Sequence, residues 1–93
     1  VFTSPGNTKA DEYATIMLDT LKYSFPKEII RTDYSDGDAD KEARFYMLQK
    51  SQCPAILTEN LFMDKERDCR KLMDDDFREQ IAEAHVRAIF LML

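Results

Sequence analysis

The sequence predicts an α/β fold with a mostly parallel sheet and flanking helices. Short apolar runs typical of strands occur at residues 1–4 and 55–58, and longer segments with helical spacing separate and follow them. Because strands that alternate with helices favour parallel pairing, we expect both runs to share one sheet. The 93 residues suffice for at most one small domain.

The first amphipathic segment follows a turn signal at Pro5-Gly6. Asn7 or Thr8 can cap this helix, and Asp11 places a carboxylate near its positive end. The helix should end before Pro26, because the residue preceding a proline avoids helical geometry. We expect one apolar stripe to pack on the sheet. That stripe comprises Ala10, Tyr13, Ala14, Met17, Leu18 and Leu21.

Two further helices are expected in the second half of the chain. Asp64 can cap a short helix that carries Cys69, Leu72 and Met73. Residues 74–76 are three aspartates that can open a longer helix. Its apolar face would comprise Phe77, Ile81, Ala84, His85, Ala88 and Met92. By propensity alone, residues 42–49 fit a helix or a strand.

Composition excludes several classes of function. The net charge is −5 and basic residues do not cluster, which argues against binding to nucleic acid or to an anionic membrane surface. The longest apolar stretch, residues 88–93, is six residues against the roughly 20 that a membrane span needs. No signal peptide is visible, but the chain starts at Val1 within a predicted strand. We therefore expect upstream sequence to be missing.

Several possible metal sites have ordinary explanations. Asp36, Asp38 and Asp40 are spaced like the start of a calcium loop, but Lys41 replaces the required glycine and the pattern ends there. His85 is the single histidine and has no partner one turn later, which predicts a packed or half-exposed side chain.

The two cysteines, Cys53 and Cys69, match neither a zinc ribbon nor a disulfide framework. We expect two inert thiols, and their pairing is left open.

Glu59 is the strongest candidate for chemistry. It follows the apolar run 55–57, and open α/β sheets bind ligands outside the carboxyl ends of their strands. A structural carboxylate held by backbone amides is the alternative, since burying a lone carboxylate is costly unless it is paired or solvated.

The residues around Glu59 also carry a resemblance. Pro54-Ala55-Ile56-Leu57-x-Glu59-x-x-Phe62 resembles the closing motif of the zinc-dependent N-acetylmuramoyl-L-alanine amidases of the type-3 family. Residues 41–48 resemble the strand that precedes this motif, and Asp68 and Leu72 occupy positions where the family has an acidic and an apolar residue. The resemblance spans nearly the whole chain, but only the C-terminal half of the family's catalytic domain.

This resemblance implies both fold and activity. The chain would be the C-terminal portion, residues 1–93, of one three-layer α/β sandwich, with a strand at Phe45–Leu48. Glu59 would be the general base and acid beside a zinc-activated water that cleaves the bond between N-acetylmuramic acid and L-alanine in peptidoglycan. The Zn²⁺ ligands would lie upstream of Val1, so we expect no metal site in this chain and no activity from it alone.

The resemblance is imperfect and suggests weaker candidates. Leu61 stands where the family often has glycine, and Asp64-Lys65 where it often has Ser-Asn, so the turn after the strand should differ. Arg31 could contact a peptide carboxylate of the substrate, and Asn60 flanks the catalytic position.

Other functions and partners follow from the same features. A non-catalytic α/β interaction module or inactive remnant is the main alternative, and a different strand-end carboxylate hydrolase is a third. Expected partners are peptidoglycan, the missing N-terminal half, and copies of the chain that associate through an open sheet face or edge. By resemblance, the protein would act in the bacterial cell envelope, as a secreted protein, or in phage lysis.

Overall fold

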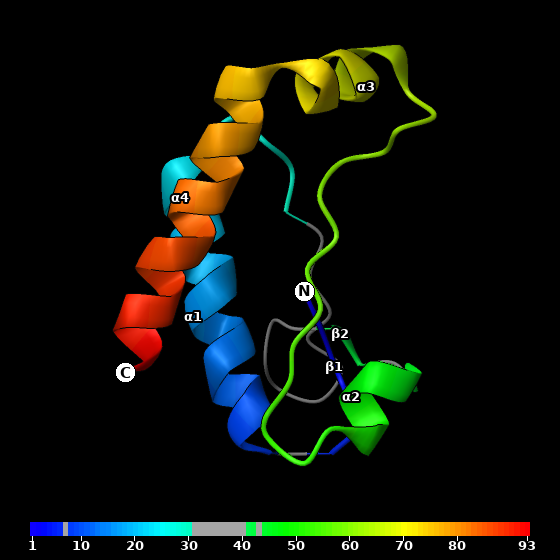
Figure 1. Ribbon diagram of the computed structural model, residues 1–93, viewed down its shortest axis with the longest axis vertical. Helices are drawn as coiled ribbons and strands as arrows, with labels where there is room; N and C mark the ends of the chain where they lie inside the picture. The colour runs from blue at the N-terminus through cyan, green and yellow to red at the C-terminus, as the bar shows by residue number, and fades with distance from the viewer. Residues whose placement is uncertain (7, 31–40, 43) are drawn as a thin grey trace.

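Helices dominate the computed structural model, which describes residues 1–6, 8–30, 41–42 and 44–93. Figure 1 shows α1 and α4 side by side and running in opposite directions, with α3 near the start of α4. The elements in chain order are β1 (Phe2–Thr3), α1 (Lys9–Ser24), β2 (Lys41–Glu42), α2 (Tyr46–Lys50), α3 (Glu66–Met73) and α4 (Asp75–Met92).

The predicted three-layer α/β sandwich with a mostly parallel sheet is wrong for the described residues. β1 and β2 do pair in parallel, with Phe2 opposite Lys41, but each strand has only two residues. Strands this short form no layer on which helices could pack, because a stable sheet needs several longer strands. The described part of the chain is instead a helical assembly with a small β contact.

The strand expected at residues 55–58 is reduced to one antiparallel bridge. The Phe2 amide donates to the Leu57 carbonyl at 2.7 Å, and the Leu57 amide donates back to the Phe2 carbonyl at 3.0 Å. β1 itself confirms the strand expected at residues 1–4. Because β1 is so short, Leu57 is the single residue of the 55–58 run that it pairs with among the described residues.

The strand that the family resemblance implied at Phe45–Leu48 is also wrong. Phe45 caps α2, and its carbonyl accepts the amides of Leu48 and Gln49 at 3.1 and 3.0 Å. Met, Leu, Gln and Lys follow in the helix, and all four are good helix formers. Phe2 packs edge-on against the Phe45 ring, with the centroids 5.3 Å apart, so α2 is attached to β1.

The boundaries predicted for the first helix are confirmed. Thr8 is the N-cap, and its amide donates to Asp11 Oδ2 at 2.7 Å. The helix ends at Ser24, two residues before Pro26. Five members of the predicted apolar stripe are buried, namely Ala10, Ala14, Met17, Leu18 and Leu21.

The partner of this stripe is α4, whereas the sequence predicted a sheet. Met17 and Leu21 of α1 form a buried cluster with Ala84 and Ala88 of α4. Alanine at the contact lets the two backbones approach closely, and side-chain volume at this contact therefore controls their spacing. The predicted apolar face of α4 is thus confirmed, although it covers a helix.

The starts of the last two helices are largely as predicted. Asp74 caps α4 and accepts the Asp76 amide at 2.9 Å, which satisfies one of the free amides of the first turn. In α3 the N-cap is Lys65, one residue later than the expected Asp64. No described helix is both long and apolar enough to cross a membrane.

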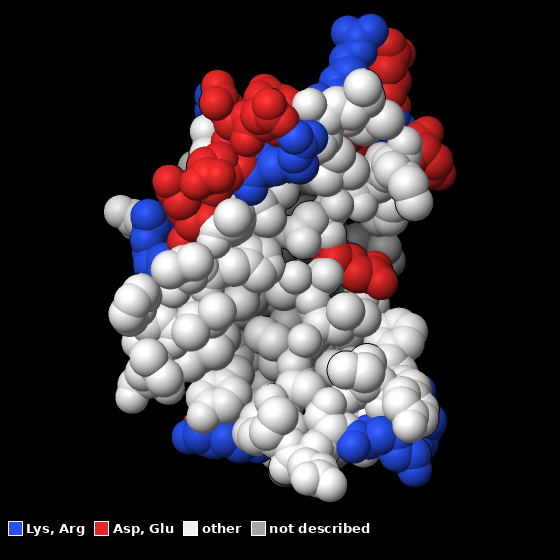
Figure 2. Space-filling view, viewed as in Figure 1, with Lys and Arg blue, Asp and Glu red and all other residues white. Residues whose placement is uncertain are grey.

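A broad uncharged surface is left exposed. Figure 2 shows charged side chains gathered over α3 and the start of α4, and a largely uncharged face below them. On α4 the exposed apolar side chains are Val86, Ile89, Phe90 and Leu91, and on α2 they are Tyr46 and Met47. A surface of this kind typically marks a contact with other protein.

Ala88→Leu should destabilise the fold by overpacking the α1–α4 contact. Ala88 is fully buried, and extra methylene groups in such a site cost about 1–3 kcal/mol. Urea unfolding measures the change in the free energy of unfolding. Ala82→Leu is the matched control, since Ala82 is exposed on α4. Equal effects of the two substitutions would contradict the packing described above.

Candidate functional site

Glu59 lies in an extended segment, residues 54–62, that is anchored on both sides of the carboxylate. The first anchor is the pair of backbone hydrogen bonds between Leu57 and Phe2. The second is a contact of 2.9 Å between the Thr58 hydroxyl and His85 Nε2 on α4. Thr58 directly precedes Glu59, so both anchors hold the backbone immediately before Glu59.

His85 contacts both Thr58 and its own helix. Its Nδ1 lies 2.7 Å from the Ile81 carbonyl oxygen, which can only accept a hydrogen bond, so Nδ1 is the donor there. Its Nε2 lies within hydrogen-bond distance of the Thr58 hydroxyl. The half-buried ring confirms the predicted packed side chain, but its link to Thr58 was not foreseen.

A third anchor follows Glu59 at the entry to α3. The Phe62 amide donates to Asp68 Oδ2 at 3.0 Å, and Asp68 is 7% exposed. Between Glu59 and this bond, Leu61 has a φ of +65°, a left-handed conformation that non-glycine residues rarely adopt. The turn after Glu59 thus has a conformation that favours glycine.

A group of charged side chains supports this third anchor. Arg67 donates to Asp68 Oδ1 at 2.8 Å and to Glu28 Oε1 at 3.0 Å, and Lys71 also pairs with Glu28. Hydrogen bonds from Lys71 and then Arg67 lower the pKa of Glu28 below its ordinary value, against the opposing effect of burial. The group connects α3 to the segment that follows α1.

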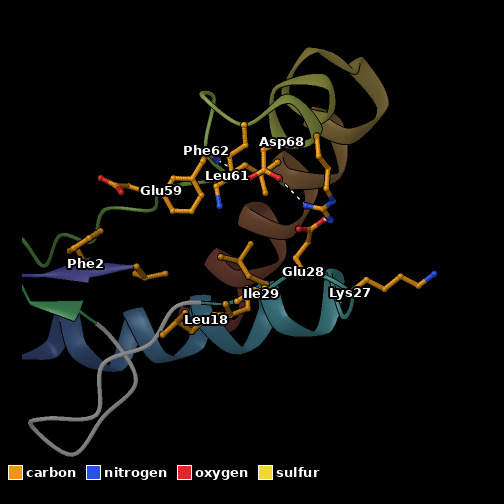
Figure 3. Close-up of a pocket in the computed structure, with 14 residues that line it drawn as sticks. Phe2, Leu18, Lys27, Glu28, Ile29, Glu59, Leu61, Phe62 and Asp68 are labelled. Carbon is orange, nitrogen blue, oxygen red and sulfur yellow. Dashed lines mark hydrogen bonds and ion pairs between the residues drawn. The ribbon is translucent and has the colours of Figure 1, made fainter.

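Glu59 stands at the rim of a pocket of about 630 Å³. Leu18, Ile29, Leu61 and Phe62 supply apolar lining, and the charged group of Glu28 and Asp68 lies on the far side (Figure 3). The Glu59 side chain points away from that group.

The Glu59 carboxylate is exposed and makes no hydrogen bond or ion pair with any described residue. The alternative role, a carboxylate held by backbone amides, has no support in this part of the chain. An exposed carboxylate beside an apolar pocket can accept and return a proton.

The remaining predicted site residues are not gathered around Glu59. Asn60 is half-buried and does not line the pocket. Arg31 and the aspartates of the calcium-like loop lie outside the described residues. Cys53 is exposed, Cys69 is half-buried, and both are free thiols.

The described residues do not gather the side chains that a metal ion needs. Nowhere among them do three or more His, Cys, Asp or Glu side chains come together in a way that could hold a metal ion. His85 is engaged by Thr58 and Ile81, so it is not available as a ligand. The described residues therefore do not form a zinc site.

The site contains residues that sequence reasoning missed. The sequence marks Asp68 only as an acidic match to the family, and no motif points to Glu28, Arg67 or Lys71. Glu28 is separated from Arg67 by 39 positions and from Lys71 by 43, so no local pattern could connect them. The family resemblance, which pairs Leu61 with a glycine position, was the available signal for the left-handed turn.

Comparison with known proteins places these features in a family. Residues 1–90 match a protein family that is described as N-acetylmuramoyl-L-alanine amidase. The chain belongs to the N-acetylmuramoyl-L-alanine amidase family. The resemblance at residues 54–62 is therefore confirmed at the level of the family, while the role of each site residue stays a prediction.

Three curated relatives are amidases or a lytic protein by name. A sporulation-specific N-acetylmuramoyl-L-alanine amidase of Bacillus subtilis is 34% identical over 71 residues, which is 75% of this chain and 28% of the relative. The N-acetylmuramoyl-L-alanine amidase CwlM of Bacillus licheniformis is 36% identical over 64 residues, 68% of this chain and 25% of the relative. An endolysin of Bacillus phage SPP1 is 38% identical over 50 residues, 54% of this chain and 18% of the phage protein.

The chain spans about a quarter of the length of the two amidases that it matches. No solved structure matches it significantly.

Glu28→Gln should flatten the acid dependence of stability. Because the folded state lowers the pKa of Glu28, the ionised carboxylate stabilises the fold above its unfolded pKa. This contribution is lost as the pH falls from the ordinary pKa of a glutamate through the lower folded pKa. Chemical unfolding across this range should show a shallower decline for Glu28→Gln. Glu83→Gln, at an exposed position of α4, is the control. If the free energy of unfolding of both variants declines equally with falling pH, the ion pairs of Glu28 do not stabilise the fold.

Proposed function

We propose that this chain is the C-terminal part of a catalytic domain that hydrolyses the amide bond between N-acetylmuramic acid and L-alanine in peptidoglycan. Membership of the amidase family supports the reaction class. The observation that carries the assignment within the chain is Glu59, an exposed carboxylate at the rim of a pocket that is unpaired among the described residues.

The proposed role of Glu59 is proton transfer. Its carboxylate accepts a proton from the attacking water as the oxygen adds to the amide carbonyl carbon. The same group then gives the proton to the amide nitrogen as the carbon–nitrogen bond breaks. The products are a carboxylate on the lactyl group of the muramic acid and a free amino group on L-alanine. A glutamate that is not held by other side chains can move between the two atoms.

The proposal places the metal outside this chain. The family resemblance implies Zn²⁺ bound by residues upstream of Val1, and the described residues offer no cluster of ligands. We accordingly propose that these 93 residues alone do not cleave peptidoglycan. Arg31 and Asn60 remain weak candidates for contact with the peptide of the substrate.

We also propose that the rest of the domain covers the exposed apolar surface of α4. Phe90 is 71% exposed and Leu91 63%, and the relatives carry about three quarters of their length outside the matched region. Without that part, copies of the chain should associate through this helical surface. The cell envelope is the proposed place of action, either of a host amidase or of a phage lytic protein, as the names of the relatives suggest.

Glu59→Gln in the complete catalytic domain should remove most activity and leave folding intact. General acid–base catalysis contributes about 10²- to 10⁴-fold, so kcat should fall by that factor with little change in KM. Cleavage of a purified muramoyl-peptide, followed by chromatography, measures the effect. Glu79→Gln on the exposed face of α4 is the matched control and should keep full activity. A Glu59→Gln domain whose kcat stays within about tenfold of the unchanged protein would exclude the proposed function.

A further inference from the structure

We propose that Asp68 is a positioning residue that holds Glu59 in place by enforcing the left-handed turn at Leu61. The inference rests on the proposed function of Glu59 and extends it to a residue that does not touch the substrate. Asp68 lies in the first turn of α3, and its Oδ2 accepts the Phe62 amide at 3.0 Å. Only three positions separate this amide from Glu59.

The turn needs an external constraint because of its conformation. Leu61 has a φ of +65°, where the side chain of an L-residue crowds its own backbone. A residue other than glycine remains in this region only when surrounding contacts hold it there. The Phe62 amide, which directly follows the turn, is held by Asp68.

The environment of Asp68 makes it suitable for this task. The side chain is almost completely buried, and Arg67 binds its second oxygen at 2.8 Å. Arg67 is in turn bound to Glu28, which also pairs with Lys71. The carboxylate is therefore oriented by Arg67 on one side and presents its other oxygen to Phe62, as Figure 3 shows for Asp68 and Phe62.

The two sides of Glu59 are then held in different ways. Before it, Leu57 and Thr58 are bound to β1 and to His85, and neither residue has a positive φ. After it, the chain turns through Leu61 and depends on Asp68. Loss of Asp68 would let Leu61 relax to a negative φ, which would swing the segment that carries Glu59. A displacement of about 1 Å at a catalytic group can cost on the order of 100-fold in rate.

The test measures kcat, KM and melting temperature in the complete catalytic domain with a purified muramoyl-peptide. Asp68→Ala should lower kcat by roughly 10- to 100-fold and leave KM nearly unchanged. Asp64→Ala, which removes an exposed carboxylate from the same loop, is the matched control and should have no effect.

Rescue separates positioning from a general loss of stability. Adding Leu61→Gly to Asp68→Ala should restore most of kcat, because glycine adopts positive φ without steric cost. Adding Met63→Gly should not, since Met63 is exposed and does not have a positive φ. If Asp68→Ala alone does not fold, the double variant with Leu61→Gly still tests the positioning role of Asp68, because this variant should be folded and active.

Three results would overturn the inference. These are wild-type kcat in folded Asp68→Ala, a double variant with Leu61→Gly that is folded but no more active than Asp68→Ala, or equal rescue by Met63→Gly. Glu59→Gln in the same assay keeps the two proposals apart. If Glu59→Gln is inactive while Asp68→Ala is fully active, only the positioning role fails; if Glu59→Gln is active, the proposed function itself fails.

Discussion

The reciprocal backbone hydrogen bonds between Phe2 and Leu57 are the constraint on which the site depends. They are the contact through which β1 pairs with the extended segment 54–62, and β1 also pairs with β2. Without them the segment would cross the molecule with its peptide groups unpaired at this point, which is unfavourable at a partly buried position. The contacts of Thr58 with His85 and of Phe62 with Asp68 follow these bonds along the segment.

From that point the chain is held at each side of Glu59 while the carboxylate itself is left unpaired among the described residues. His85 reaches from α4 to Thr58, and Asp68 reaches from α3 to Phe62. The α1–α4 contact keeps α4 in place, and His85 of α4 links this helix pair to the segment that carries Glu59. Polar groups that hold the backbone have defined partners, whereas the group assigned to chemistry does not.

The sequence predicted what depends on local interactions and failed where distant segments meet. The cap at Thr8, the end before Pro26 and the apolar stripe of α1 follow from neighbouring residues, and they are as expected. The α/β sheet was wrong because strand pairing depends on residues far apart, and residues 46–50 follow their helix propensity. Glu59 could be singled out from its motif. Its anchors could not, since His85 and Thr58 are 27 positions apart and Glu28 and Lys71 are 43 apart.

A crystal structure of the complete catalytic domain with a bound muramoyl-peptide tests the central claim most directly. The account predicts that the Glu59 carboxylate lies within hydrogen-bond reach, about 2.6–3.2 Å, of the scissile amide or of one water between them. It also predicts that the Phe62 amide remains bound to Asp68. A Glu59 side chain that is remote from the scissile bond, with another carboxylate in its place, would contradict the account.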